Sequence, residues 1–246
     1  MRLLVSVRSA GEVEAAVEGG AEIIDAKEPS QGSLGAVDPV ELARIASAVP
    51  DGMPLSVALG DHSTPGAARD AFELIRAIPH RPTELYVKIG FSGLAEGTTV
   101  RAVLEAAVAA ARGSALEPEV IAVAYADHQR AGTVHRHTIV DAAAEAGARG
   151  VLLDTWSKDG RGLFAWDSPT DIRQWLAEAR RRRLLTALAG SLAVDQIDLV
   201  RAIGPDVLGV RGAACESGRN GTVSARLVRQ LAVAKDRAHP PLVGAL

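Results

Sequence analysis

Short apolar runs alternate with longer alanine-rich stretches along nearly the whole chain, and this alternation limits the fold more than any other feature. The runs are almost continuously apolar, as strands buried on both faces of a parallel sheet are. The stretches between them repeat apolar residues at spacings of three and four, which is typical of amphipathic helices. We predict eight strands, at residues 2–7, 22–26, 54–59, 84–89, 119–125, 149–154, 184–189 and 206–211.

Local signals mark where the helices between these strands begin. Three predicted helices start with a capping side chain followed by a proline suited to the first turn, at Asp38-Pro39, Thr64-Pro65 and Ser168-Pro169. The second of them is predicted to cover residues 66–78. An open doubly wound sheet would also alternate in this way. Eight even units without a linker instead predict an α/β, single-domain (β/α)8 TIM barrel at residues 1–238, with a C-terminal tail at 239–246.

Charge, hydropathy and cysteine content argue against several classes of protein. The formal net charge of −3 argues against a general nucleic-acid binder. The sequence contains no run of 18 apolar residues, so we expect no membrane span. The first residues are too polar for a signal peptide, and the lone Cys215 has no disulfide partner and no adjacent activating base, so we expect a cytoplasmic protein. The arginines at 180–183 are expected to form a solvated helix end. A homo-oligomer is expected, as for many soluble enzymes.

The lysines are few and unevenly placed. Only four of the 27 basic residues are lysines, and Lys27, Lys88 and Lys158 lie at or just after the ends of the second, fourth and sixth predicted strands. In a (β/α)8 barrel this edge carries the active site. We therefore expect the three amines to converge at one mouth, beside Asp25 and Asp154.

Lysine has a chemistry that arginine lacks. Arginine stays protonated at any biological pH, whereas a lysine amine can lose its proton and condense with a carbonyl group. Neighbouring ammonium groups disfavour each other's charge, so at least one lysine pKa in the cluster should fall. The alternative is that each lysine is only a structural ion-pair partner of a nearby aspartate. Three lysines at one mouth favour the reactive amine.

Glycine-containing loops after the seventh and eighth predicted strands indicate an anion site. Such loops commonly bind phosphate in (β/α)8 barrels through backbone N–H groups. Gly190, Ser191 and Gly212 would let an anion approach the backbone, and Arg211 or Arg219 would add positive charge. The simpler alternative is that these glycines only form turns.

Other polar residues carry weaker signals. The sequence leaves open whether Asp61-His62 and Asp127-His128, which also follow predicted strands, act as acid–base pairs. The motif His135-x-His137 has the wrong spacing for one helix face and no acidic third ligand nearby. No metal site is therefore expected.

Several of these segments match one known family. They read LLVSV, EGGAEIIDAKEPSQGSLGA, YVKIG, LLDTWSKDG, LAGSL and VRGAACESGRNG. Together they resemble the (5-formylfuran-3-yl)methyl phosphate synthase family, whose enzymes make the furan precursor of the one-carbon carrier methanofuran. The segment with Asp25-Ala-Lys27-x-Pro29 and Gly32-Ser33-Leu34-Gly35 is specific, and we include Ser33 among the predicted substrate- or phosphate-binding residues.

The resemblance implies a (β/α)8 barrel that uses no metal or organic cofactor. It also implies a reaction that joins two molecules of the triose phosphate glyceraldehyde 3-phosphate into a furan aldehyde, with loss of one phosphate and water. Lys27 matches the family's Schiff-base lysine and Lys88 its proton-accepting lysine. Asp25, Asp154 and Lys158 match its other charged active-site residues.

These roles suggest a division of labour, stated here as a hypothesis. Lys27 would condense with one triose, Asp25 would orient Lys27, and Lys88 would move protons. Asp154 and Lys158 would assist dehydration and phosphate loss. Two alternatives are a class I aldolase acting on phosphorylated sugars, which would release no phosphate, and a non-catalytic barrel that binds a sugar phosphate without a covalent adduct.

Replacing Lys27 by arginine tests the reactive amine. The variant Lys27→Arg keeps the positive charge but cannot form an imine, so turnover of glyceraldehyde 3-phosphate should be abolished. The measurement is the rate of product formation by purified wild-type and variant proteins. Near-normal turnover by the variant would refute the imine.

Overall fold

The computed structural model describes residues 1–237, in which eight parallel strands close into one barrel in chain order. The strands are β1 (Arg2–Val7), β2 (Ile23–Ala26), β3 (Leu55–Asp61), β4 (Leu85–Gly90), β5 (Glu119–Tyr125), β6 (Gly150–Asp154), β7 (Leu185–Leu188) and β8 (Val207–Val210). Each begins and ends within two residues of its predicted position, so the predicted TIM barrel is confirmed. Residue 238 and the predicted tail at 239–246 lie outside the described residues.

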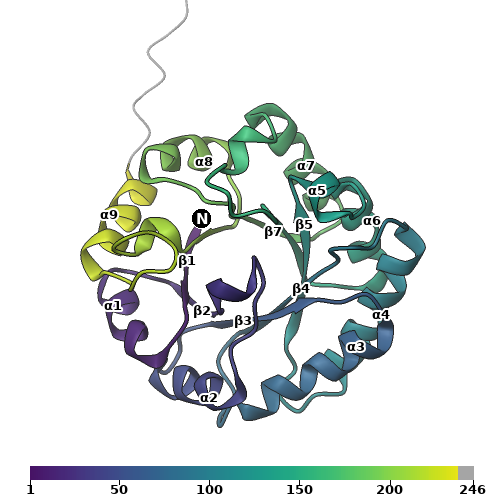
Figure 1. Cartoon of the computed structure of the whole chain (residues 1–246), viewed down its shortest axis with the longest axis horizontal. Helices are drawn as coiled ribbons and strands as arrows, with labels where there is room; N and C mark the ends of the chain where they lie inside the picture. The colour runs from purple at the N-terminus through teal and green to yellow at the C-terminus, as the bar shows by residue number, and fades with distance from the viewer. Residues whose placement is uncertain (238–246) are drawn as a thin grey trace, which may run out of the picture.

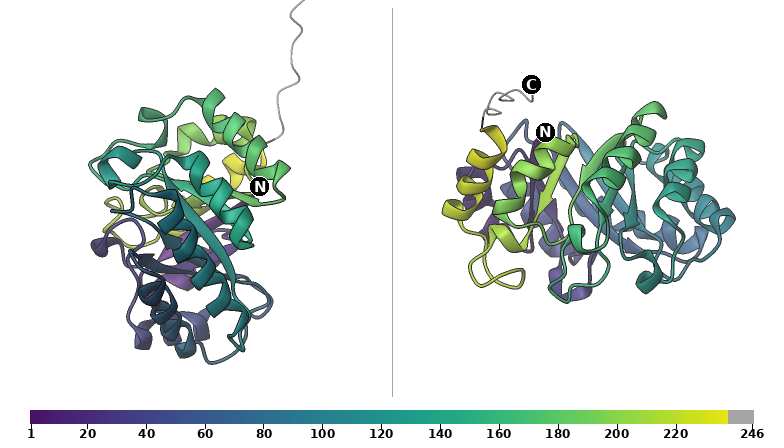
Figure 2. Two further views of the ribbon diagram at one scale, coloured as in Figure 1. Left: turned by 90° about the vertical axis from the view of Figure 1, so that its right-hand side faces the viewer. Right: turned by 90° about the horizontal axis from the view of Figure 1, so that it is seen from above.

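Helices surround the strands on the outside of the barrel (Figures 1 and 2). They are α1 (Val13–Glu18), α2 (Pro39–Ala48), α3 (Pro65–Asp70), α4 (Gly97–Arg112), α5 (His128–Ala131), α6 (Arg136–Ala146), α7 (Pro169–Arg181), α8 (Ile197–Ile203) and α9 (Ala225–Asp236). The side chains of Asp38, Thr64 and Ser168 each accept a hydrogen bond from the backbone N–H three residues later, which confirms these three helix starts.

The helices differ from the prediction in two places. The predicted helix at 66–78 is divided into α3 and a 3-10 helix, η3 (Ala71–Ala77). The short helix α5, which strict alternation did not predict, stands between β5 and α6. The arginines at 180–183 are exposed at the end of α7, as predicted. No helix within residues 1–237 is long and apolar enough to cross a membrane.

Residue alternation along the strands explains how charged side chains enter the barrel. Successive residues of a strand point to opposite faces, so Ile23 packs in the small apolar cluster inside the barrel and Ile24 in the large core between strands and helices. Asp25, the next residue on the Ile23 side, faces the interior, and Lys88 on β4 and Asp154 on β6 do the same. The inner face therefore changes from apolar to charged towards the carboxyl ends of the strands.

Close packing between the first and last helices accompanies closure of the barrel. β1 pairs with β8, and α9 packs against α1 on the outside. At the end of α1, a Cβ atom on Gly19 would lie 2.4 Å from Val228 Cβ and 2.8 Å from the Ala225 carbonyl oxygen, both on α9. Only glycine lets these two helices approach so closely.

Substituting Gly19 by alanine should destabilise the fold. The added methyl group overpacks the α1–α9 contact, so we expect Gly19→Ala to lower the free energy of unfolding by about 1–3 kcal/mol. The measurement is urea denaturation of the purified protein. The matched control is Gly113→Ala at the end of α4, where the nearest atom to a new Cβ is 3.6 Å away, and it should cause no loss. Equal stabilities of the two variants would contradict the packing argument.

Candidate active site

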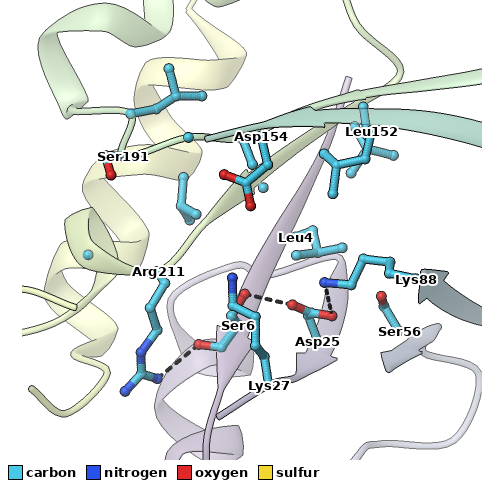
Figure 3. A pocket seen from close by; sticks show the side chains of 18 of the residues that line it. Leu4, Ser6, Asp25, Lys27, Ser56, Lys88, Leu152, Asp154, Ser191 and Arg211 are labelled. Carbon is cyan, nitrogen blue, oxygen red and sulfur yellow. Dashed lines mark hydrogen bonds and ion pairs between the residues drawn. The ribbon is translucent and has the colours of Figure 1, made fainter. Parts of the chain in front are cut away.

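Five charged residues predicted to act together lie on one cavity at the carboxyl ends of the strands. Asp25 and Lys27 come from β2 and its end, Lys88 from β4, Asp154 from β6 and Lys158 from the loop after β6. The cavity has a volume of about 400 Å³ and an apolar floor formed by the inner cluster of the barrel (Figure 3). The predicted convergence of the three lysines is therefore present in the structure.

Two of the three lysines form ion pairs with the two aspartates. Lys88 Nζ lies 2.6 Å from Asp25 Oδ1, and Ser6 Oγ donates a hydrogen bond of 2.6 Å to Asp25 Oδ2 (Figure 3). Lys158 Nζ donates to Asp154 Oδ1 at 2.8 Å. The prediction that Asp25 orients Lys27 is thus not supported by the ion pairing, because Asp25 binds Lys88 instead.

The positive charges keep both buried carboxylates ionised. Burial by itself raises the pKa of Asp25, but Lys88 and Lys27 outweigh it and hold that pKa below its ordinary value. Burial acts in the same way on Asp154, where Lys158 and Lys27 lower the pKa. The backbone N–H of Thr155 also donates to Asp154 Oδ1, at 2.7 Å.

Lys27 is the lysine of the cluster that pairs with neither aspartate. Its side chain is buried, and among residues 1–237 no carboxylate oxygen lies within ion-pair distance of its Nζ (Figure 3). Burial lowers the pKa of Lys27 to about 7; the charges of Lys88 and Lys158 act in the same direction, against Asp154 and Asp25. Near neutral pH a large fraction of this amine is therefore unprotonated and able to attack a carbonyl carbon.

The loop after β7 lines the cavity with Gly190, Ser191 and Leu192. Gly190 has φ +104°, and a Cβ on it would lie 3.1–3.3 Å from Thr155 and Leu163, so the site requires glycine. Ser191 has φ +51°, which is uncommon for a residue with a side chain. Within residues 1–237, the backbone N–H groups of Ser191 and Leu192 donate no hydrogen bond. The loop therefore remains the predicted anion site, with two backbone donors that are not used within residues 1–237.

The structure corrects the prediction that Arg211 binds phosphate. The Arg211 guanidinium donates two hydrogen bonds to Glu12 and three to the carbonyl groups of Ser6, Arg219 and Gly221. All five of its N–H donors are thus used within the protein, and Glu12 neutralises its charge. Arg219, the other arginine predicted to add positive charge, lines the same cavity together with Gly212 and is half-buried. Arg219 is therefore the better candidate for binding an anion.

Ser33 lies beside the cavity, in a loop over the barrel mouth. Residues 28–36, here called the mouth loop, follow Lys27. Residues 29–36 of this loop line a neighbouring opening of about 730 Å³ together with Asp61, His62, Lys158 and Arg219. Ser33 Oγ donates a hydrogen bond of 3.2 Å to the Tyr125 hydroxyl, so its oxygen is already engaged within the protein. Sequence reasoning missed Tyr125, although its inner-face position at the end of β5 was available as a signal.

The residues whose roles the sequence left open have distinct surroundings. Asp127 accepts hydrogen bonds from the backbone N–H groups of Trp156 and Ser157, at 2.6 and 2.9 Å, and so holds the loop that carries Lys158. The His62 ring bonds the Leu59 carbonyl group, and His128 packs edge-on against His135.

The surroundings of Cys215 and of the His135-x-His137 motif bear on thiol reactivity and on metal binding. Burial raises the pKa of Cys215 to about 11, so this thiol is a poor nucleophile at neutral pH. No group of three or more His, Cys, Asp or Glu residues arranged to hold a metal ion occurs in the described part of the chain, which includes His135 and His137.

The cluster and its position define the protein as a (β/α)8-barrel enzyme with a buried lysine, Lys27, that has no ion-pair partner among residues 1–237. The sequence model of the family described as 4-HFC-P synthase matches residues 3–232. The (5-formylfuran-3-yl)methyl phosphate synthase of Methanopyrus kandleri is 38% identical over 236 residues, with 95% of this chain and 98% of the relative covered. That of Methanocaldococcus jannaschii is 34% identical over 246 residues, covering 94% and 98%. The chain therefore belongs to the (5-formylfuran-3-yl)methyl phosphate synthase family.

Solved structures of low sequence identity share the fold. Phosphoribosyl anthranilate isomerase from Thermus thermophilus superimposes with a TM-score of 0.60 at 16% identity, covering 95% of this chain and 98% of that one. A 3-hexulose-6-phosphate synthase gives a TM-score of 0.58 at 18% identity, covering 95% and 99%. At these identities the likeness supports the barrel fold alone.

The charge state of Lys27 can be measured directly. We expect the rate at which formaldehyde and borohydride methylate Lys27 to rise with pH and to reach half its plateau near pH 7, because only the neutral amine reacts. Lys235 is the internal control, since its hydrogen bonds to Asp236 and Glu22 outweigh burial and raise its pKa above 10.5. Mass spectrometry of peptides from pulse-labelled protein gives both rates. Parallel titration of Lys27 and Lys235 would show that Lys27 is an ordinary ammonium group.

Proposed function

We propose that this enzyme joins two molecules of glyceraldehyde 3-phosphate into (5-formylfuran-3-yl)methyl phosphate, releasing one phosphate and two water molecules. The observation that carries the proposal is the unpaired Lys27, buried between two lysine–aspartate pairs, with a pKa of about 7. The names of the relatives support the product. We further propose that the product serves as the furan precursor of methanofuran.

The first step in this proposal is imine formation. The neutral Lys27 Nζ attacks the carbonyl carbon of one triose phosphate, and the carbonyl oxygen leaves as water. The protonated imine withdraws electrons from the neighbouring carbon, whose C–H bond can then break. The triose becomes an enamine, a three-carbon nucleophile, which attacks the aldehyde carbon of the second triose and forms the new C–C bond.

Lys88 and Asp25 are suited to move the protons. Their nitrogen and oxygen atoms are 2.6 Å apart, a distance at which a proton passes between them without an intervening water. Both side chains line the cavity that also receives Lys27. We assign to this pair the transfer of the proton from the imine's neighbouring carbon.

Asp154 and Lys158 form the second acid–base pair of the cavity. Lys158 Nζ also contacts Thr155 Oγ1, at 3.1 Å, which fixes its position beside Asp154. We assign to this pair the protonation of the hydroxyl groups that leave as water and of the departing phosphate. The N–H groups of Ser191 and Leu192, with Arg219, would hold a phosphate group of the substrate.

Borohydride trapping tests the imine. Wild-type protein incubated with glyceraldehyde 3-phosphate and borohydride should gain the mass of a reduced triose phosphate on the peptide that contains Lys27. The control is Lys27→Arg under the same conditions, which should gain none. A non-catalytic sugar-phosphate-binding barrel would give no adduct on either protein. An adduct on Lys88 or Lys158 would show that the imine forms on that lysine and not on Lys27.

Product analysis separates the proposed synthase from an aldolase. Glyceraldehyde 3-phosphate alone should yield inorganic phosphate together with the ultraviolet absorbance of a furan aldehyde, at one phosphate per furan. A class I aldolase would form the adduct but release no phosphate. Trapping on Lys27 without phosphate release would therefore contradict the synthase and retain the imine.

A further inference from the structure

The mouth loop crosses over the centre of the barrel instead of following its rim (Figure 1). It contains the 3-10 helix η2 (Pro29–Gln31), and a hydrogen bond of 2.8 Å from the Glu28 N–H to the Gly35 carbonyl closes it on itself. Arg219, from the loop after β8, donates to the Gly32 carbonyl at 3.0 Å. Since Lys27 is the residue directly before this loop, the position of the loop bears on the position of the amine.

A chain of hydrogen bonds attaches the other side of the mouth loop to the barrel. Ser33 Oγ donates to the Tyr125 hydroxyl at 3.2 Å, and the Tyr125 hydroxyl donates to Asp61 Oδ1 at 2.8 Å. The backbone N–H of Ser92 donates to the same Asp61 oxygen, at 2.9 Å. The chain thus links the mouth loop to β5, to β3 and to the segment after β4. Tyr125 is only 1% exposed and its bond to Ser33 is buried, whereas Asp61 at the other end of the chain is exposed.

Gly90, at the end of β4, provides the space in which this junction fits. A Cβ atom on Gly90 would lie 2.2 Å from Asp61 Oδ1, 2.6 Å from the Tyr125 hydroxyl and 2.7 Å from Leu34 Cδ1. Leu34 belongs to the mouth loop and packs in the apolar cluster inside the barrel together with Tyr125. Polar and apolar contacts of the loop therefore meet at Gly90, a strand position without a side chain.

We infer that Tyr125 and Asp61 are positioning residues that hold the mouth loop closed over Lys27. They act through Ser33 and the loop, because neither lines the cavity that contains the lysine cluster. A closed loop limits the entry of water to an imine on Lys27 and so slows its hydrolysis. This consequence for catalysis rests on the proposed function, whereas the attachment of the loop does not.

Hydrogen–deuterium exchange tests the attachment without reference to catalysis. Tyr125→Phe keeps the aromatic ring and removes only the hydroxyl group, so we expect exchange of the amides in residues 28–36 to rise about five- to tenfold, the effect of one ordinary hydrogen bond. Exchange in α4, on the outside of the barrel, should stay unchanged and show that the fold is intact. Unchanged exchange in residues 28–36 of a folded variant would overturn the inference.

Three further substitutions separate the hydrogen bonds from charge and packing. Asp61→Asn retains an oxygen that accepts from Tyr125 and should exchange like wild type, whereas Asp61→Ala should resemble Tyr125→Phe. Ser33→Ala removes the first bond of the chain and should also loosen the loop. The matched serine control is Ser47→Ala on the exposed face of α2, where the hydroxyl bonds only the Ala43 carbonyl, and it should change nothing. Loosening by Asp61→Asn equal to that by Asp61→Ala would contradict the role of the acceptor.

Kinetics then link the loop to catalysis. In Tyr125→Phe we expect kcat for furan formation to fall about five- to tenfold while KM stays within about twofold, because the substitution removes none of the proposed phosphate-binding groups. Borohydride should trap correspondingly less adduct at steady state. A loosened loop with unchanged kcat would refute the catalytic consequence. If wild-type protein forms no adduct at all, the proposed function fails, and the exchange result still decides whether the loop is attached in this way.

Discussion

Three lysines and two aspartates share one buried cavity, and this imbalance of charge governs the chemistry that the protein can perform. Each carboxylate is taken by one ammonium group, Asp25 by Lys88 and Asp154 by Lys158. A third buried ammonium group without a partner is costly in a water-poor site, so Lys27 is driven towards its neutral form. The lysine that the pairing leaves out is therefore the one equipped to be a nucleophile.

The barrel holds the charged side chains of the cavity in place. Parallel strands in one register place Asp25, Lys88 and Asp154 on the inner face at the same end, above an apolar floor that belongs to the core. Because the floor and the outer core are packed, the charged groups cannot relax towards solvent without unfolding the strands that carry them. Loops then add what the strands do not supply: the segment around Ser191 lines the cavity, and the mouth loop crosses the centre of the barrel.

Two arginines of the loop after β8, Arg211 and Arg219, have different surroundings, and only Arg211 is fully bonded within the protein. The Arg211 guanidinium donates all its hydrogen bonds to Glu12 and to three carbonyl groups. It thereby joins the loop after β8 to the start of the chain. Its neighbour Arg219 donates a hydrogen bond to the Gly32 carbonyl of the mouth loop and also lines the cavity. Arg211 thus maintains the loop after β8, whereas Arg219 contacts both the mouth loop and the cavity.

The sequence by itself determined the barrel, the strand ends and the gathering of Lys27, Lys88 and Lys158, because strand periodicity and the rarity of lysine are properties of local order along the chain. Tertiary structure alone decided which aspartate binds which lysine, since partners on different strands meet only after closure of the barrel. It likewise decided that Arg211 is consumed by Glu12, nearly two hundred residues away, and that Tyr125 meets Asp61 and Ser33. Hydrogen bonds of that range depend on distances across the barrel, which no spacing along the chain encodes.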